Sequence, residues 1–224
     1  MGRASVVFDL DGTLADTSGD LLAAANACFR ALGLGDLLHA PADNGTALRG
    51  GKAMLRLGFT RVAGFGEGDV EAQYPELLAH YARALSVETS MYPDAIAATA
   101  ELKRRGYGVG ICTNKPAVLA ERLLKELEVR EAFDVVLGSD SLPVKKPDPE
   151  HLRETVRRMG CDPRRTCLVG DSETDRKTAL RAGVPSILVT FGPAGGNMAA
   201  LAPAALLPDY AMLPDLVERL IGAP

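Results

Sequence analysis

The sequence predicts an α/β fold in which a parallel β-sheet carries helices on both faces. Short apolar runs of strand length alternate with amphipathic helical patterns through the second half of the chain. A long helical stretch also separates the first predicted strand from the next, and it far exceeds a simple crossover connection. The chain has 224 residues, enough for one sizeable domain and a smaller module. We therefore expect an α/β core interrupted by a helical insertion.

Apolar runs bounded by turn residues predict the strands of the sheet. The first is Ser5–Leu10, whose apolar residues end in two acids followed by a Gly-Thr pair. The others are Val109–Thr113, Val135–Gly138, Thr166–Gly170 and Ser186–Thr190. Helical patterns separate these later strands and cover Lys115–Leu127, Pro149–Met159 and Thr174–Ala182. Proline near one helix start and glycine just beyond another helix end fit the terminal preferences of helices.

The insertion after the first strand is predicted to be all-helical. Its helical segments are Ser18–Leu32, roughly Thr46–Leu57, and Asp69–Leu85, with glycines between them. We expect a core domain of residues 1–16 and 91–224 and a helical module of residues 17–90 that lies over the strand ends. We expect Ser18 to cap the first helix of the module and the chain to hinge at Asp16–Ser18 and Ser86–Tyr92.

The composition argues against a nucleic-acid, membrane or secreted protein. The formal net charge is −4, and aromatic residues make up only 5% of the chain, so no base-stacking platform is evident. The four cysteines lack Cys-x-x-Cys spacing and no signal peptide precedes the first strand, so we expect a cytoplasmic protein. Glycines and prolines interrupt the uncharged stretch Ala182–Pro208. This stretch predicts a strand, a Gly-rich loop and a short Ala-rich helix instead of a membrane span.

Polar side chains follow the predicted strands at the edge where the carboxyl ends of parallel strands meet. In chain order they are Asp9 and Asp11, then Thr113, then Lys145 and Lys146, then Asp171 and Asp175. Two acids so close together repel unless a cation lies beside them, and Mg²⁺ typically binds carboxylates together with a substrate phosphate. Each group has an ordinary alternative: a helix cap for the threonine, solvation for the lysines, or a favourable helix dipole for the later acids. Their occurrence at consecutive strand ends favours metal-assisted chemistry on a phosphate.

The same residues form motifs known from a protein family. The chain resembles the haloacid dehalogenase-like phosphohydrolases in Asp9-x-Asp11-Gly-Thr13, Thr113-Asn-Lys-Pro, Lys146-Pro-x-Pro and Gly170-Asp171-x-x-x-Asp175. The residue sequences of the last three motifs are most similar to those of the phosphoglycolate phosphatase branch. The resemblance implies a Rossmann-like core, an all-α cap domain formed by the insertion, and Mg²⁺-dependent hydrolysis of a small phosphate monoester.

The resemblance implies a separate role for each acid. Asp9 would attack phosphorus to form an aspartyl-phosphate and would also bind the metal. Asp11 would protonate the leaving alkoxide and then activate water, reaching the metal only through its backbone carbonyl. Asp171 would complete the metal site, and Asp175 would orient it from the second coordination shell.

The remaining motif residues would bind the phosphoryl group. Thr113 would donate a hydrogen bond to a phosphoryl oxygen, and Lys146 would neutralise charge that develops on the transferring group. Physics alone leaves Lys145 and Lys146 equivalent, and the Lys-Pro match favours Lys146. Backbone N–H groups near Leu10, Asn114 and Lys115 are further candidates for contacts with the phosphate.

An acid at position 11 favours a phosphate ester, because a C–O–P leaving group needs a proton. The leading substrate is 2-phosphoglycolate. The first alternative is a sugar-phosphate phosphatase or a β-phosphoglucomutase-like mutase, and the second is a catalytically silent binding protein, which the intact acid pair disfavours. The expected partner is a small phosphorylated metabolite, with no nucleic acid or membrane, and the protein is expected to be a monomer or homodimer.

Substrate choice is predicted to depend on the insertion. Arg49-Gly50-Gly51-Lys52 joins two cations to a flexible glycine pair, which suits a small anion such as a carboxylate. A solvated basic helix start is the ordinary alternative for the same residues. The histidines, His39, His80 and His151, show no spacing to one another or to the motifs, so we expect no catalytic role for them.

Overall fold

The computed structural model describes residues 2–192 and 197–224. The chain forms two compact units, one of Met1–Ala15 with Met91–Pro224 and one of Asp16–Ser90. The first boundary between the units lies one residue before the predicted one, and the second lies at the position predicted. We call them the α/β unit and the helical unit and describe each by itself.

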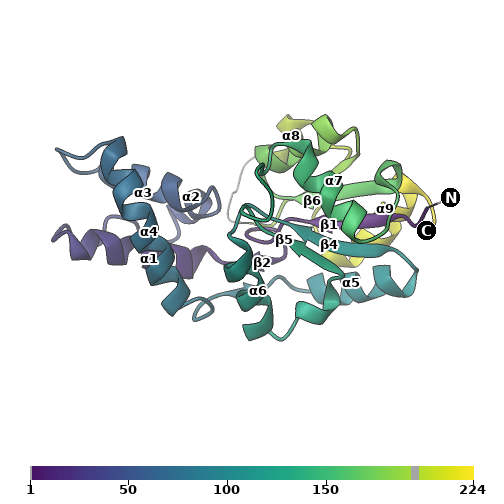
Figure 1. Ribbon diagram of the computed structural model, residues 1–224, viewed down its shortest axis with the longest axis horizontal. Coiled ribbons are helices and arrows are strands. Elements are labelled where there is room, and N and C mark those ends of the chain that lie inside the picture. The colour runs from purple at the N-terminus through teal and green to yellow at the C-terminus, as the bar shows by residue number, and fades with distance from the viewer. Residues whose placement is uncertain (1, 193–196) are drawn as a thin grey trace. The chain divides into compact units, whose positions relative to one another are not determined.

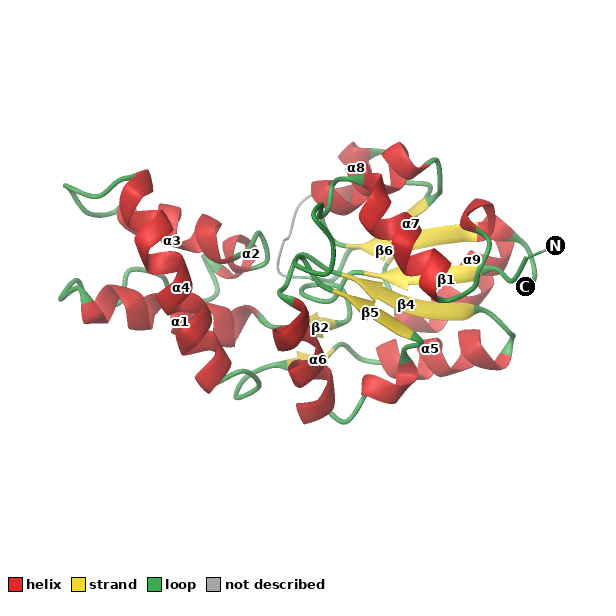
Figure 2. Ribbon diagram, viewed as in Figure 1, coloured by secondary structure: helices red, strands yellow, loops and turns green. Residues whose placement is uncertain are grey.

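The α/β unit is built on a six-stranded sheet, shown by the arrows in Figure 2. Its strands are β1 (Ser5–Phe8), β4 (Gly108–Cys112), β5 (Val135–Leu137), β6 (Thr166–Gly170), β7 (Ser186–Val189) and β8 (Ala205–Leu207). The order is β5-β4-β1-β6-β7-β8, and all neighbouring strands are parallel. The predicted parallel α/β sheet is confirmed. Because β1 lies between β4 and β6, the polar residues after these three strands come together at one edge.

Helices cover both faces of this sheet (Figure 1). They are α5 (Ala95–Arg104), α6 (Ala117–Glu126), α7 (Pro149–Arg158), α8 (Glu173–Ala182) and α9 (Leu213–Ile221). Short 3₁₀ helices occur at Arg130–Ala132, Pro163–Arg165, Met198–Leu201 and Tyr210–Met212. On one face α7 and α8 pack together over a core that includes Val7, Leu152, Val156 and Leu168. On the other face α5 packs against α9.

Several elements of the α/β unit were missed or misplaced by the sequence prediction. The helices α5 and α9 were not predicted. The residue before α5, Asp94, has a left-handed backbone (φ 59°), and its side chain makes no capping hydrogen bond, so the start of α5 lacks the usual sequence signal. The short Ala-rich helix predicted before Pro208 corresponds to the four-residue 3₁₀ helix Met198–Leu201, and the edge strand β8 that follows it was not predicted. The predicted Gly-rich loop falls partly on residues 193–196, which lie outside the described residues. In the described part of the chain, no helix is both long enough and apolar enough to cross a bilayer.

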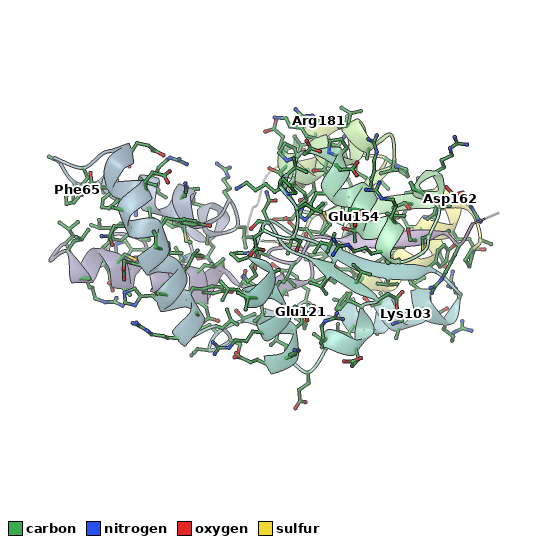
Figure 3. The ribbon with its side chains drawn as sticks, in the orientation of Figure 1. Phe65, Lys103, Glu121, Glu154, Asp162 and Arg181 are labelled. Carbon is green, nitrogen blue, oxygen red and sulfur yellow. The ribbon has the colours of Figure 1, made fainter. Side chains whose placement is uncertain are left out.

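The helical unit contains α1 (Ser18–Ala31), α2 (Asn44–Ala47), α3 (Gly51–Phe59) and α4 (Glu67–Arg83). Its core includes Phe29, whose ring lies against Phe59 with centroids 5.3 Å apart. Phe65, labelled in Figure 3, stacks on Phe59 at 4.8 Å from the loop that precedes α4. Gly58 makes this packing possible, because a Cβ there would lie 2.2 Å from the Phe29 ring. Aromatic burial of this kind stabilises the unit strongly.

Two predictions about this unit were wrong. The single helix predicted over Thr46–Leu57 is two helices, because the chain breaks at Gly50, whose φ of +96° favours glycine. Ser18 is the first residue of α1 and not its cap. Its hydroxyl instead donates a hydrogen bond to Asp16 Oδ1 at 2.6 Å.

Asp20 ties the start of the helical unit to its end. Its buried carboxylate accepts hydrogen bonds from the N–H of Glu88 at 3.0 Å, the N–H of Thr89 at 2.9 Å and the Thr89 hydroxyl at 2.7 Å. The chain segments beside them, β2 (Ala15–Asp16) and β3 (Ser90–Met91), pair as a two-stranded sheet. The entering and leaving chains are thereby fixed to each other.

Replacing Asp20 with alanine should lower the free energy of unfolding by about 3 kcal/mol, because it leaves buried donors without an acceptor. Urea denaturation followed by circular dichroism would measure the loss. The matched control is Asp36→Ala, whose exposed ion pair with Arg30 should contribute less than about 1 kcal/mol. Equal losses in the two variants would contradict a structural role for Asp20.

Candidate active site

Asp9 follows β1 directly and is held in place from its backbone outward. Its N–H donates to the carbonyl of Val169 at 2.9 Å, which continues the ladder between β1 and β6. One carboxylate oxygen, Oδ1, accepts from the N–H of Leu10 at 2.7 Å and lies 2.9 Å from Nζ of Lys146. The side chain is 13% exposed, so a reactant can reach it while most of the group is desolvated.

Lys146 connects Asp9 to Asp175. Its Nζ lies 2.6 Å from Oδ1 of Asp175, and its side chain is only 1% exposed, whereas Lys145 is exposed. The Asn114 side chain donates to the Lys146 carbonyl at 3.0 Å and so fixes the lysine backbone. Burial disfavours the charged ammonium, but the attraction of Asp175 and Asp9 outweighs it and raises the pKa of Lys146. Lys146 therefore keeps its positive charge at the edge of the sheet where the carboxyl ends of the strands meet.

Asp171 follows β6 and Asp175 lies in the first turn of α8, where Ser172 caps the helix by accepting from the N–H of Asp175. The Ser172 hydroxyl and the Asp171 N–H both donate to Oδ2 of Asp175. Gly170 is required here, since a Cβ would lie 2.4 Å from Cβ of Asp175. The Thr13 hydroxyl donates to Oδ1 of Asp171 at 3.3 Å.

Three acids converge on one point: carboxylate oxygens of Asp9, Asp171 and Asp175 all lie within 4.8 Å of one another. Burial and the negative charge of Asp175 together raise the pKa of Asp9 to about 6, although the positive charge of Lys146 opposes them. Burial and the charges of Asp175 and Asp9 raise the pKa of Asp171 well above its usual value. Acids that repel in this way fit a divalent cation with oxygen ligands, because the cation would relieve the repulsion.

Asp11 and Thr113 complete the set of predicted core residues. Oδ1 of Asp11 lies 2.7 Å from Nζ of Lys115, and both side chains are largely buried. Thr113 is buried after β4, and its hydroxyl oxygen accepts from the N–H of Lys115 at 3.2 Å. Because β1 and β4 are neighbouring parallel strands, Asp11 and Thr113 lie after strand ends on the same edge of the sheet as Asp9.

Sequence reasoning missed three contributors to this site. The Lys115 side chain contacts Asp11, although only its backbone was considered. Thr13 contacts Asp171, and its place in the first motif was an available signal. Tyr210, buried in the last 3₁₀ helix, donates from its hydroxyl to the Thr13 carbonyl at 2.8 Å. No local pattern marks Tyr210, because it lies 197 residues from Thr13.

The two cations predicted to select the substrate, Arg49 and Lys52, lie in the helical unit. Arg49 is exposed just before α3, and no carboxylate in the described part of the chain lies within ion-pair distance of it. Lys52 differs, because its Nζ lies 2.6 Å from both carboxylate oxygens of Glu71 and above the Tyr74 ring. The two members of the predicted pair therefore have different environments.

His151 on α7 is fully buried beside this site. Burial, together with the positive charge of Lys146, lowers the pKa of His151 to about 4. In the unfolded chain the His151 ring takes up a proton as the pH falls below about 6.5. In the folded chain the ring takes up that proton only near pH 4. Stability contributed by the neutral ring is complete above pH 6.5 and is lost as the pH falls from 6.5 to 4.

As the pH falls from 6.5 to 4, the free energy of unfolding should decrease less in His151→Leu than in the wild type. The difference between the two decreases should reach about 3 kcal/mol. Urea unfolding at a series of pH values measures the difference. His80→Leu is the control for replacing a histidine of the helical unit. An unchanged slope in His151→Leu would show that other groups cause the acid sensitivity.

Comparison with known proteins bears on this site. Residues 4–183 match the family model of the haloacid dehalogenase-like hydrolases. The chain is 35% identical to a phosphoglycolate phosphatase of Agrobacterium fabrum over 220 residues, which cover 96% of this chain and 93% of the relative. It is 37% identical to a phosphoglycolate phosphatase of Neisseria meningitidis, with the same two coverages.

A solved structure shares the fold at lower identity. The crystal structure of a predicted phosphoglycolate phosphatase from Haemophilus somnus superimposes with a TM-score of 0.82 at 23% identity, covering 96% of this chain and 97% of that one. This likeness concerns the fold alone.

Proposed function

The chain belongs to the haloacid dehalogenase-like hydrolases and is a phosphatase, and on this premise we propose that it hydrolyses 2-phosphoglycolate through an aspartyl-phosphate on Asp9. The observation that carries the mechanism is the convergence of Asp9, Asp171 and Asp175 around one point, with Lys146 touching two of them. The substrate rests on the relatives, several of which are named phosphoglycolate phosphatases.

In the proposed first step a carboxylate oxygen of Asp9 attacks phosphorus while the bond to the leaving oxygen breaks. Asp11 gives its proton to that oxygen, so the leaving group departs with a hydroxyl group and not as an alkoxide. Thr113 and the backbone N–H groups of Leu10 and Asn114 hold the phosphoryl oxygens. Lys146 stabilises the negative charge on the transferring group from its buried position.

In the second step Asp11 takes a proton from water as the water oxygen attacks phosphorus and the bond to Asp9 breaks. Inorganic phosphate leaves, and both carboxyl groups return to their starting states. Splitting the hydrolysis in this way replaces one difficult displacement with two easier ones.

The acids fit a bound Mg²⁺, which would supply positive charge to offset the repulsion between Asp9 and the phosphate dianion. The carboxylates of Asp9 and Asp171 and the backbone carbonyl of Asp11 would hold it. Asp175 would act from outside this set, because Lys146, Ser172 and the backbone of Asp171 already bind its two oxygens.

The direct test is phosphate release from 2-phosphoglycolate and from p-nitrophenyl phosphate, each with EDTA and after Mg²⁺ is restored. We expect metal-dependent release from both esters and the higher kcat/KM for 2-phosphoglycolate. Absence of metal-dependent release from any ester would favour a silent binding protein. Conversion of a hexose 1-phosphate to the 6-phosphate would favour a mutase, and a panel of phosphorylated metabolites would detect a preferred sugar phosphate.

We further propose that the helical unit is a cap domain and that Arg49 recognises the substrate carboxylate. Arg49→Ala should raise KM for 2-phosphoglycolate by about 10-fold or more, since an ionic hydrogen bond is lost, and should leave p-nitrophenyl phosphate hydrolysis nearly unchanged. The comparison variant Lys52→Ala tests whether the cation held by Glu71 also takes part. Equal effects of Arg49→Ala on both esters would contradict carboxylate recognition.

A further inference from the structure

A second ion pair joins two neighbouring strand ends of the α/β unit. Nζ of Lys115 lies 2.7 Å from Oδ1 of Asp11, and the two side chains are 3% and 17% exposed. We propose that Lys115 is a positioning residue that directs the carboxyl group of Asp11 toward the oxygen of the leaving group. The proposal rests on the acid–base role of Asp11 stated above, and it gives the Lys115 side chain a function in the same reaction.

The backbone of Lys115 is fixed from two directions. Its N–H donates to the Thr113 hydroxyl at 3.2 Å, and its carbonyl accepts from the N–H of Ser139 at 2.9 Å. The loop after β5 packs directly against it at Gly138, where a Cβ would lie 2.7 Å from the Lys115 carbonyl oxygen and 2.3 Å from the nitrogen of Ala117. A long lysine side chain is most useful as a positioning group when its backbone is held in this way, because fewer conformations compete.

The loop that carries Asp11 is also constrained. The N–H of Gly12 donates to the Ala15 carbonyl at 2.8 Å, and the backbones of Asp11 and Ala15 pair in an isolated β-bridge. Strands β1 and β4 are parallel neighbours, with Phe8 beside Ile111, so the loops that follow them emerge side by side. The contact of Lys115 with Oδ1 restricts the rotation of the Asp11 carboxyl group about its side-chain bonds.

This restriction matters because proton transfer depends strongly on geometry. Asp11 must reach the leaving oxygen as the bond from that oxygen to phosphorus breaks, and it must later reach the attacking water. A displacement of about 1 Å in a reacting group can cost roughly 10²-fold in rate. A buried lysine here has two other conceivable roles, direct phosphate binding and support of the fold, and each predicts a different dependence on the leaving group.

The test uses phenyl phosphate and p-nitrophenyl phosphate, which are alike in shape but differ in how strongly the leaving oxygen needs a proton. Lys115→Met should lower kcat/KM for phenyl phosphate by about 10²-fold and for p-nitrophenyl phosphate by less than about 5-fold, at saturating Mg²⁺. Asp11→Asn should show the same pattern, and adding Lys115→Met to it should cause no further difference between the esters. Lys145→Met, which changes an exposed neighbouring lysine, is the matched control.

Equal losses on both esters would overturn the proposal, because phosphate binding or folding would then explain the effect. Unchanged or faster hydrolysis of phenyl phosphate would also overturn it. If Asp11→Asn itself shows no dependence on the leaving group, the proposed role of Asp11 fails as well. If only Lys115→Met lacks that dependence, the positioning role alone fails. Thermal melting identifies misfolding, and Lys115→Gln then replaces the methionine variant.

Discussion

The Asp9→Asn variant should lose turnover by about 10⁴-fold or more, because an amide oxygen cannot form the aspartyl-phosphate. The fold should survive this change, since the amide oxygen can still accept from the N–H of Leu10. Burial raises the pKa of Asp9 to about 6. Above that pH the ionised carboxylate of Asp9 therefore lowers the free energy of unfolding of the metal-free protein. The variant should therefore be at least as stable as the wild type at pH 7.5, and an activity loss could not be attributed to unfolding.

Phosphate release and urea unfolding on the same preparation separate these two effects. Asp36→Asn, at an exposed aspartate of the helical unit, is the matched control and should keep full activity. Residual turnover above about 1% of the wild type, in protein purified away from host phosphatases, would mean that another group attacks phosphorus. Trapping of labelled phosphate on the wild type but not on the variant would support the covalent intermediate.

The second large effect is expected at Lys146. Lys146→Met removes the cation that lies between Asp9 and Asp175, and it leaves two acids in a largely buried site without their partner. Breaking a buried ion pair in this way typically costs about 3–5 kcal/mol of unfolding free energy. We also expect kcat to fall by about 10³-fold, since a preorganised charge on the transferring phosphoryl group is lost.

Urea unfolding with and without Mg²⁺ and phosphate-release assays would measure both effects. Lys145→Met should change neither stability nor activity appreciably, because that side chain is exposed. If Lys145→Met instead causes the larger activity loss, the proposed assignment of the phosphate-stabilising lysine is wrong. A loss of stability in Lys146→Met with full activity would limit Lys146 to a structural role.

Parts of the fold followed from local pattern alone. The strands β1, β4, β5, β6 and β7 were recognised because apolar runs of strand length stand between turn residues, and parallel strands buried on both faces require such runs. The elements that were missed have weaker local signals. The strand β8 has only three residues, and α5 lacks a side-chain cap at its start. The break before α3 depends on one glycine backbone angle, which helical periodicity does not report.

The sequence by itself determined the chemical groups of the candidate site, because acids, a threonine and a lysine follow consecutive strands and parallel strands bring their ends to one edge. Only the tertiary structure decided which groups touch. It buried Lys146 between Asp9 and Asp175 and left its neighbour exposed, and it placed Lys115 on Asp11 and Tyr210 on Thr13. These contacts join residues 29 to 197 positions apart. Their distances depend on strand register, loop packing and side-chain rotamers, and the packed fold sets all three together.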